Sequence, residues 1–218
     1  MLTDPKEIEI ISAARQKNVR DHRRSRDHFI HIFNDFFRSK DLRGQVLIDL
    51  GPGQYDFGVL AKERGAKTVG VDNDPAVVKL GRYKGFEVHE GRLQRLDLID
   101  FGRSFDGLFC KFSLNCFWFW DQPEAHKRFV SDLVGLGAPQ SWGWLAPWNG
   151  VPKNASLTDG QVQAKLREQA ELFEAHGFYA YNFTEDQARR YGVNGNVANN
   201  ALFVRGLNVP SEIRSMQR

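Results

Sequence analysis

The chain has 218 residues, of which 41% are apolar and 26% charged, and this composition excludes a disordered or fibrous protein. No apolar stretch approaches the roughly 18 uncharged residues of a membrane span, and the acidic start at residues 1–9 differs from a secretory signal, so we expect a cytoplasmic protein. The two cysteines, Cys110 and Cys116, are too few for a disulfide scaffold, and a net charge of +3 does not by itself indicate a nucleic-acid partner.

Residues 1–40 form a segment ahead of the main domain. Apolar side chains recur there at three- and four-residue steps from Ile8 to Phe36, which predicts one or two helices and no strand. We expect this N-terminal helical segment to act as a lid or substrate cap. Six basic residues and one acid lie between positions 15 and 26; they form either a solvated helix face, the commoner meaning of such a run, or a site for phosphates and anionic substrates.

The N-terminal segment contains three residues of types that can bind a metal. His28, His31 and Asp35 share a helix face at steps of three and four, a spacing that a metal could use. The phenylalanines interleaved with them indicate instead that the helix packs on the domain. We therefore predict no metal.

From residue 41 onward, strands alternate with helices. Strands are expected at 46–50, 68–71, 86–90, 105–109, 142–146, 178–183 and 201–204, and helices at 57–64, 75–82, 122–136, 158–176 and 185–191. This alternation predicts an α/β fold, with a doubly wound, seven-stranded, mostly parallel sheet in one domain of residues 41–218. Turn-forming residues at 192–196 allow the last strand to return antiparallel beside the strand before it.

The segment at 46–55 carries the most informative motif. A buried strand containing Asp49 runs into Gly51 and Gly53, a tight turn where the backbone can approach a ligand without interference from a Cβ atom. The next strand ends in Asp72, 19 residues beyond Gly53, where a carboxylate can accept both hydrogen bonds of a ribose. The pattern predicts a nucleoside-binding site at the carboxyl end of the sheet.

The kind of nucleoside follows from what the motif lacks. A dinucleotide fingerprint has a third glycine where this chain has Asp56, and that carboxylate would repel a pyrophosphate. The lysine of a phosphate-binding P-loop is also missing. Asp49 is placed to attract a cation. A ligand with an adenosine ribose, a sulfonium and an ammonium, but no phosphate, satisfies these observations.

In these features the chain resembles the class I S-adenosylmethionine-dependent methyltransferases over roughly residues 41–204. The family's first motif, acid-x-Gly-x-Gly, matches residues 49–53, and the acid that opens its motif after the fourth strand matches Asp106. Arg92 stands where an acid is usual near the adenine, and Tyr55 replaces a frequent third glycine. The resemblance implies a Rossmann-like fold and S-adenosylmethionine as cofactor. The implied cofactor-binding residues are Asp49, Gly51, Pro52, Gly53, Tyr55, Asp72, Asn73, Gly91, Arg92, Leu93, Lys111 and Phe112.

The acceptor site should be built from the segments after the fourth and fifth strands, where all five tryptophans lie. Trp142 and Trp144 are two apart in a strand and are expected to share a buried face. The expected substrate-binding residues are Trp118, Trp120 and Trp148, an aromatic lining that suits a planar, apolar or sugar-ring acceptor. The polar candidates for a catalytic role are Asn115, Asp121 and His126.

Bases of nucleic acids are not favoured as acceptors. Asn115 is not followed by the Pro-Pro-aromatic sequence of amino-methylating DNA enzymes, and Cys116 lacks the neighbouring proline usual for a cytosine C5 nucleophile. We predict an S-adenosylmethionine-dependent enzyme that methylates an oxygen or nitrogen of a small-molecule or saccharide-like acceptor. Two alternatives stay open: an RNA methyltransferase that uses the basic N-terminal helix, and a non-catalytic regulatory module that retains the cofactor pocket.

Overall fold

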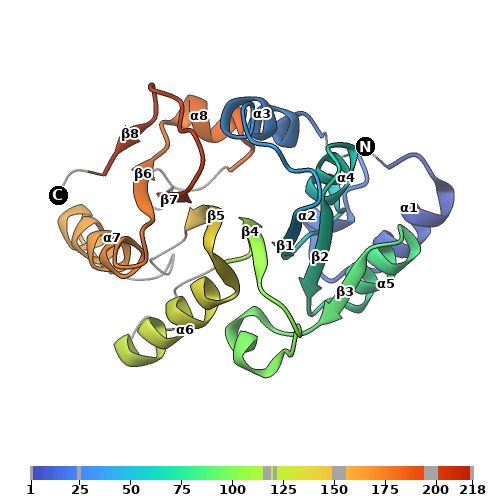
Figure 1. Ribbon diagram of the computed structural model, residues 1–218, viewed down its shortest axis with the longest axis horizontal. Coiled ribbons are helices and arrows are strands. Elements are labelled where there is room, and N and C mark those ends of the chain that lie inside the picture. The colour runs from blue at the N-terminus through green and yellow to red at the C-terminus, as the bar shows by residue number, and fades with distance from the viewer. Residues whose placement is uncertain are drawn as a thin grey trace.

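An eight-stranded sheet forms the centre of the protein, with strands in the order β3-β2-β1-β4-β5-β7-β6-β8 (Figure 1). The computed structural model describes residues 2–23, 26–114, 119, 122–148, 156–193 and 201–216. The strands are β1 Val46–Leu50, β2 Lys67–Asp72, β3 Glu87–Glu90, β4 Phe105–Lys111, β5 Gly137–Trp148, β6 Tyr179–Asn182, β7 Ala201–Arg205 and β8 Arg214–Ser215.

Helices lie on both faces of this sheet (Figure 1). They are α1 Pro5–Ser12, α2 Lys17–Arg20, α3 Asp27–Phe36, α4 Asp56–Glu63, α5 Pro75–Tyr83, α6 Pro123–Gly135, α7 Asp159–Glu174 and α8 Glu185–Arg190, with a 3-10 helix, η1, at Leu93–Leu98. Three helices therefore precede β1 where the sequence predicts one or two. Within the described ranges, no helix combines the length and the apolar character that crossing a bilayer requires.

The sheet is mostly parallel, as predicted, but it has eight strands and not seven. The strands from β3 to β5 run parallel to one another, whereas β7 is antiparallel to both β5 and β6. The additional strand, β8, has only two residues and pairs with the edge strand β6, so it is too short to produce a hydrophobic pattern. The chain passes from β1 outward to β2 and β3 and then returns to β4 on the other side of β1. This change of direction is the place where open α/β sheets bind ligands.

Two apolar cores cover the faces of the sheet. On one face, Phe129 of α6 and Phe173 of α7 are buried against β4 and β5. On the other, Phe36 of α3 packs in a cluster with Trp142 and Trp144 of β5. Both tryptophans are almost fully buried, which confirms the prediction of a shared buried face. Because α3 contributes to this second core, it is an integral part of the α/β domain's packing.

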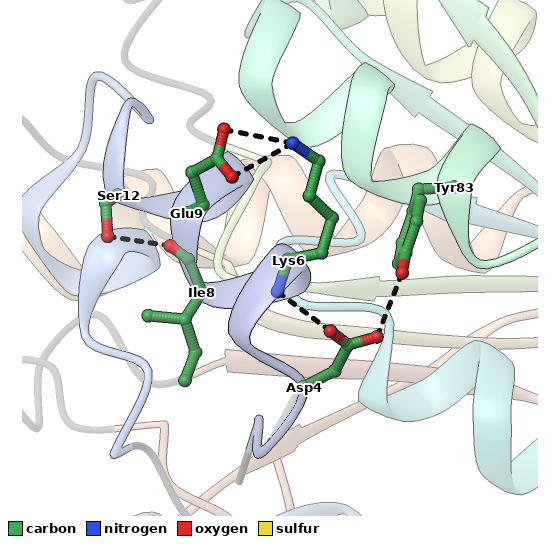
Figure 2. Close-up of polar contacts among 6 residues, drawn as sticks. All are labelled: Asp4, Lys6, Ile8, Glu9, Ser12 and Tyr83. Atoms are coloured by element: carbon green, nitrogen blue, oxygen red, sulfur yellow. Dashed lines mark hydrogen bonds and ion pairs between the residues drawn. The ribbon is translucent and has the colours of Figure 1, made fainter.

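The first helix, α1, is attached to α5 through its N-terminal cap (Figure 2). Asp4 accepts a hydrogen bond from the backbone N of Lys6, with 2.8 Å between Oδ1 and N, and a second from the Tyr83 hydroxyl, with 3.1 Å between Oδ2 and Oη. Lys6 also pairs with Glu9 at 2.9 Å, but both side chains are exposed, so this pair adds little stability. The capping carboxylate therefore both starts α1 and fixes it on the domain.

Candidate functional site

A cavity of about 320 Å³ lies at the carboxyl ends of β1, β2 and β4, beside the switch point. The residues that line it come from the glycine turn after β1, the ends of β2 and β4, the segment after β3, and the chain around α2. They are Gln16, Asn18, Val19, Phe29, Asp49, Gly51, Pro52, Gly53, Gln54, Asp56, Val71, Asp72, Asn73, Gly91, Leu93, Gln94, Phe109, Lys111, Phe112 and Ser113. Ten of the twelve implied cofactor-binding residues are in this set, and Tyr55 and Arg92 are not.

The glycine turn needs its glycines for two different reasons. Gly51 has φ +74°, and a Cβ atom there would lie 1.9 Å from Oγ of Ser113, on the loop that follows β4. Gly53 has φ +56°, and a Cβ atom there would meet nothing within 4 Å. The first glycine therefore allows two loops to pack together, and the second leaves open space at the cavity.

Asp49 is the most buried acid of the site. Its residue is 2% exposed, and within the described ranges Oδ2 accepts no hydrogen bond. Burial raises the pKa of Asp49 well above its usual range, and the neighbouring charges of Asp72 and Asp56 raise it further. A cationic group next to Asp49 would stabilise its ionised form, whereas a diphosphate would be repelled. The cavity thus fits a cationic, phosphate-free ligand.

Asp72 lies at the end of β2 and faces the same cavity. Burial raises its pKa to about 6, against the opposing effect of backbone hydrogen bonds, of which the one from N of Asp74 measures 2.8 Å. Helix α5 is capped by Asp74, which accepts a hydrogen bond from N of Ala76 at 3.0 Å. Asp72 is therefore not needed as the cap of α5 and keeps acceptor capacity for a ligand.

One side of the cavity is formed by the N-terminal segment. Gln54, in the glycine turn, donates from Nε2 to the carbonyl oxygens of Val19 at 3.1 Å and Asp21 at 2.7 Å. The backbone N of Arg15 donates to Oδ2 of Asp74 at 2.6 Å. The sequence predicts a lid or cap, but it does not identify Gln16, Asn18 and Val19 as lining residues. Their pairing with the glycine turn depends on contacts between distant parts of the chain, which have no local sequence signal.

The last residue of β4 and the residues that follow it line the cavity near the turn. Lys111 is 6% exposed, and its Nζ lies 4.9 Å from the ring centroids of both Phe29 and Phe112. Phe112 has φ +73°, so the chain bends sharply as β4 ends. Lys111 and Phe112, two of the implied cofactor-binding residues, line the cavity together with Phe29 of α3.

Two of the implied cofactor-binding residues point elsewhere. The ring of Tyr55 is fully buried and stacks on Phe86, with 5.0 Å between centroids. It fills space left by Gly81, where a Cβ atom would lie 2.2 Å from its hydroxyl oxygen. Arg92 is exposed, and Leu93 and Gln94 face the cavity instead. Neither the Tyr55 ring nor the Arg92 side chain lines the cavity, although the resemblance implies that both bind the cofactor.

The structure also corrects the placement of two acceptor-side candidates. Trp148 is fully buried in the core, where its Nε1 donates to Oε1 of Gln169 at 2.8 Å, and it does not line the cavity. His126 stacks over Trp148 at 6.0 Å between centroids and is 7% exposed. Burial lowers the pKa of His126 to about 4, so it is neutral at pH 7. The other candidates, Asn115, Trp118, Trp120 and Asp121, lie outside the described residues.

The histidine-rich face of α3 is used for packing and ion pairing. Asp35 accepts hydrogen bonds from Nε of Arg190 at 2.9 Å and from the hydroxyl of Tyr191 at 3.0 Å. In the part of the chain that the structure describes, no group of three or more histidine, cysteine or acidic side chains could hold a metal ion.

Comparison with known proteins bears on the fold. No family model and no curated sequence matches the chain. The structure of magnesium protoporphyrin IX methyltransferase (ChlM) from Synechocystis with bound SAM is similar at a TM-score of 0.54 and 15% identity, covering 92% of this chain and 90% of that chain. The structure of DesVI from Streptomyces venezuelae is similar at a TM-score of 0.53 and 14% identity, covering 97% of this chain and 100% of that chain. The structure of the sugar N-methyltransferase KedS8 from Streptoalloteichus is similar at a TM-score of 0.51 and 13% identity, covering 82% of this chain and 85% of that chain.

The expected family resemblance is confirmed at the level of the fold. The parallel part of the sheet, the antiparallel β7 and the position of the cavity agree with what the sequence predicts. The chain has the Rossmann-like fold of the class I S-adenosylmethionine-dependent methyltransferases.

Proposed function

We propose that the protein is an S-adenosylmethionine-dependent methyltransferase that acts on an oxygen or nitrogen atom of a small-molecule or saccharide-like acceptor. The observation that carries this proposal is Asp49, a buried carboxylate whose Oδ2 has no hydrogen-bond partner within the described ranges, beside a glycine turn and next to Asp72. An unpaired buried carboxylate is costly unless a ligand compensates it. S-adenosylmethionine supplies two positive groups and no phosphate.

The residues that line the cavity divide into three roles. Asp72 would accept hydrogen bonds from the ribose hydroxyls, Gly91 and Leu93 would lie along the adenine, and the glycine turn with Asp49 would hold the methionine portion. When bound, the cofactor supplies an electrophilic methyl group. The contribution of the protein is then to align the acceptor and to exclude water, and we propose that the N-terminal segment serves as the lid.

The acceptor class is proposed from the size of the site and from the structural neighbours. The cavity of about 320 Å³ is at the lower end of the range for small-molecule sites, and the segment around α2 encloses part of it. Two of the neighbours are, by name, a porphyrin methyltransferase and a sugar N-methyltransferase. These comparisons support a small acceptor, and they leave the acceptor atom to experiment.

Titration with S-adenosylhomocysteine tests the proposal. The wild type should bind it, and Asp72→Ala should bind it more weakly by about 1–3 kcal/mol, because a hydrogen bond to a charged group is lost. Asp97→Ala is a matched control, since this exposed acid pairs with Arg95 at 3.0 Å and does not line the cavity. Equal affinity in the wild type and Asp72→Ala would contradict the assignment of Asp72 to the ribose, and no binding by the wild type would contradict the proposed function.

A further inference from the structure

Lys111 is the one basic residue among the described residues that line the cavity. It ends β4, two positions after Phe109, which pairs in register with Asp49 of β1. Successive side chains of a strand alternate between faces, so Lys111 and Asp49 project from the same face of the sheet. The ammonium therefore belongs to the end of the cavity where Asp49 and the glycine turn lie.

Within the described residues, two aromatic rings lie beside this ammonium. Nζ of Lys111 lies 4.9 Å from the centroid of Phe29, which α3 provides, and 4.9 Å from that of Phe112, which follows Lys111 in the chain. The electron-rich faces of aromatic rings attract cations at this distance, more strongly where water is excluded. With the residue only 6% exposed, the Lys111 side chain is largely shielded from water beside the cavity that it lines.

Among the described lining residues, Asp56 is the one carboxylate left that could act as a general base. In the described part of the chain, no histidine, cysteine or tyrosine lines the cavity, and two of its three carboxylates, Asp49 and Asp72, are proposed to hold the cofactor. A neutral hydroxyl acceptor would need a base to remove its proton. An acceptor oxygen that is already ionised needs none, and a nearby ammonium would stabilise it.

We propose that Lys111 is the binding group for an anionic acceptor oxygen, a carboxylate or a phenolate, next to the methyl donor. This inference rests on the proposed function and deepens it, because it selects oxygen over nitrogen and an anion over a neutral acceptor. In the transfer, the new O–CH3 bond forms as the S–CH3 bond of the donor breaks, and the electron pair of that bond stays on sulfur. No proton is released, and the products are a methyl ester or ether and the neutral thioether.

The surface beside the opening of the cavity also has positively charged side chains. A groove adjoins the cavity at Asn18, which lines both, and its other lining residues are Lys17, Arg20, His22, Arg23 and one acid, Asp21. Within the described ranges, neither Lys17, Arg20 nor Arg23 forms an ion pair. A positive potential at the opening would raise the local concentration of anionic acceptors.

Benzoate and benzamide are suitable probes, because they have similar size and shape but only benzoate is an anion. Each is titrated by calorimetry, at constant ionic strength, into the protein saturated with S-adenosylhomocysteine and into the protein without it. We expect the saturated wild type to bind benzoate roughly tenfold more tightly than benzamide, the size of effect expected for a hydrogen bond to a charged group. Lys111→Met should lose this preference, and Lys111→Arg should retain part of it.

Lys84→Met is the matched control. Lys84 is also largely buried and pairs with Glu7 at 2.9 Å, but it lies outside the cavity, so the preference for benzoate should persist in this variant. If the wild type does not distinguish the two probes, or if Lys111→Met retains the preference, the inference is wrong. A large loss of S-adenosylhomocysteine affinity in Lys111→Met would also overturn it, because Lys111 would then bind the carboxylate of the cofactor. If S-adenosylhomocysteine does not bind at all, the proposed function fails, and the inference that rests on it fails too; normal binding without a preference for benzoate overturns the inference alone.

Discussion

Gln54 joins the glycine turn to the N-terminal segment through a hydrogen bond from its Nε2 to the carbonyl oxygen of Asp21, with 2.7 Å between the two atoms. A second bond from the same nitrogen reaches Val19 at 3.1 Å, and this residue lines the cavity. The segment around α2 has exposed side chains and only a four-residue helix, so few other interactions hold it. Segments of this kind open at a low free-energy cost. The two bonds of Gln54 should therefore control how readily the cavity opens.

Gln54→Ala should release S-adenosylhomocysteine faster than the wild type. Each lost hydrogen bond weakens closure by about 0.5–1.5 kcal/mol, so the dissociation rate should rise between about fivefold and a hundredfold. Stopped-flow measurement of ligand dissociation checks this. Gln187→Ala is the control, because it also removes a bond from a glutamine Nε2 to a backbone carbonyl, 2.9 Å to Glu212, but away from the cavity. An unchanged rate in Gln54→Ala would show that the segment does not act as a lid.

Three alanine substitutions separate stability from binding in the glycine turn. Gly51→Ala should lower the free energy of unfolding by about 2–4 kcal/mol, because its Cβ atom would meet Ser113 and its φ is positive. Gly53→Ala should cost only about 1 kcal/mol of stability, for the positive φ, yet weaken S-adenosylhomocysteine binding at least about tenfold, because its Cβ atom would occupy space at the cavity. Gly102→Ala has the same strain at φ +60° and open space outside the cavity, so it should retain full affinity. Urea denaturation and calorimetry measure the two effects, and equal affinities of Gly53→Ala and Gly102→Ala would contradict this assignment of the turn.

The parts of the site that the sequence predicts are those that depend on local backbone geometry. A positive φ requires glycine at Gly51 and Gly53, and the end of a buried strand places Asp49 and Asp72 at one edge of a parallel sheet. These constraints act over a few residues, so they appear as a motif. For the same reason, most strand positions are predicted closely, whereas the two-residue strand β8 is not.

The parts that the sequence does not predict depend on packing between distant segments. Tyr55 directly follows the turn, yet its ring points into the core, because Gly70 and Gly81 leave room for it there. Tryptophan is a residue type that often lines pockets. Trp148 instead lies in the core, where its Nε1 donates a hydrogen bond to Gln169 of α7. An aromatic residue near a binding site gives no local indication of which side its ring will face.

Binding of S-adenosylhomocysteine should weaken as the pH falls through about 6. The pKa of Asp72 is raised to about 6, chiefly by burial, so below this pH its carboxyl is protonated in the free protein and is a poorer acceptor for ribose hydroxyls. Calorimetry between pH 5 and pH 8 measures the change. Asp72→Asn removes the titrating carboxyl at this position. Any pH dependence of binding that remains in the variant should come from Asp49, whose pKa is also raised. Identical pH profiles for the wild type and Asp72→Asn would contradict the role of Asp72.

His126 should make the protein less stable at acid pH. Burial lowers its folded-state pKa to about 4, whereas an unfolded chain has a value near 6.5, so the unfolded state binds more protons between these values. The stabilising contribution of the neutral ring is complete above about pH 6.5 and is lost as the pH falls towards 4, by up to about 3 kcal/mol. His126→Phe keeps a ring at this site and does not titrate. Urea denaturation should therefore show the wild type losing stability relative to His126→Phe over this interval, and a constant difference between the two proteins would show that His126 titrates normally.

The basic groove around α2 distinguishes a small anionic acceptor from RNA. Three of its cations, Lys17, Arg20 and Arg23, have no ion-pair partner within the described ranges, and a single strand that contacts three cations should give a slope of only about −2 in a plot of log K against log salt. We therefore expect a 20-nucleotide single-stranded RNA to bind weakly at low salt and to be released at physiological salt, in a fluorescence anisotropy titration. Arg20→Ala should reduce the slope by about 0.7, the contribution of one phosphate contact, whereas Arg95→Ala, outside the groove, should leave it unchanged. A slope steeper than about −4 would need twice as many phosphate contacts as this groove supplies and would favour RNA as the acceptor.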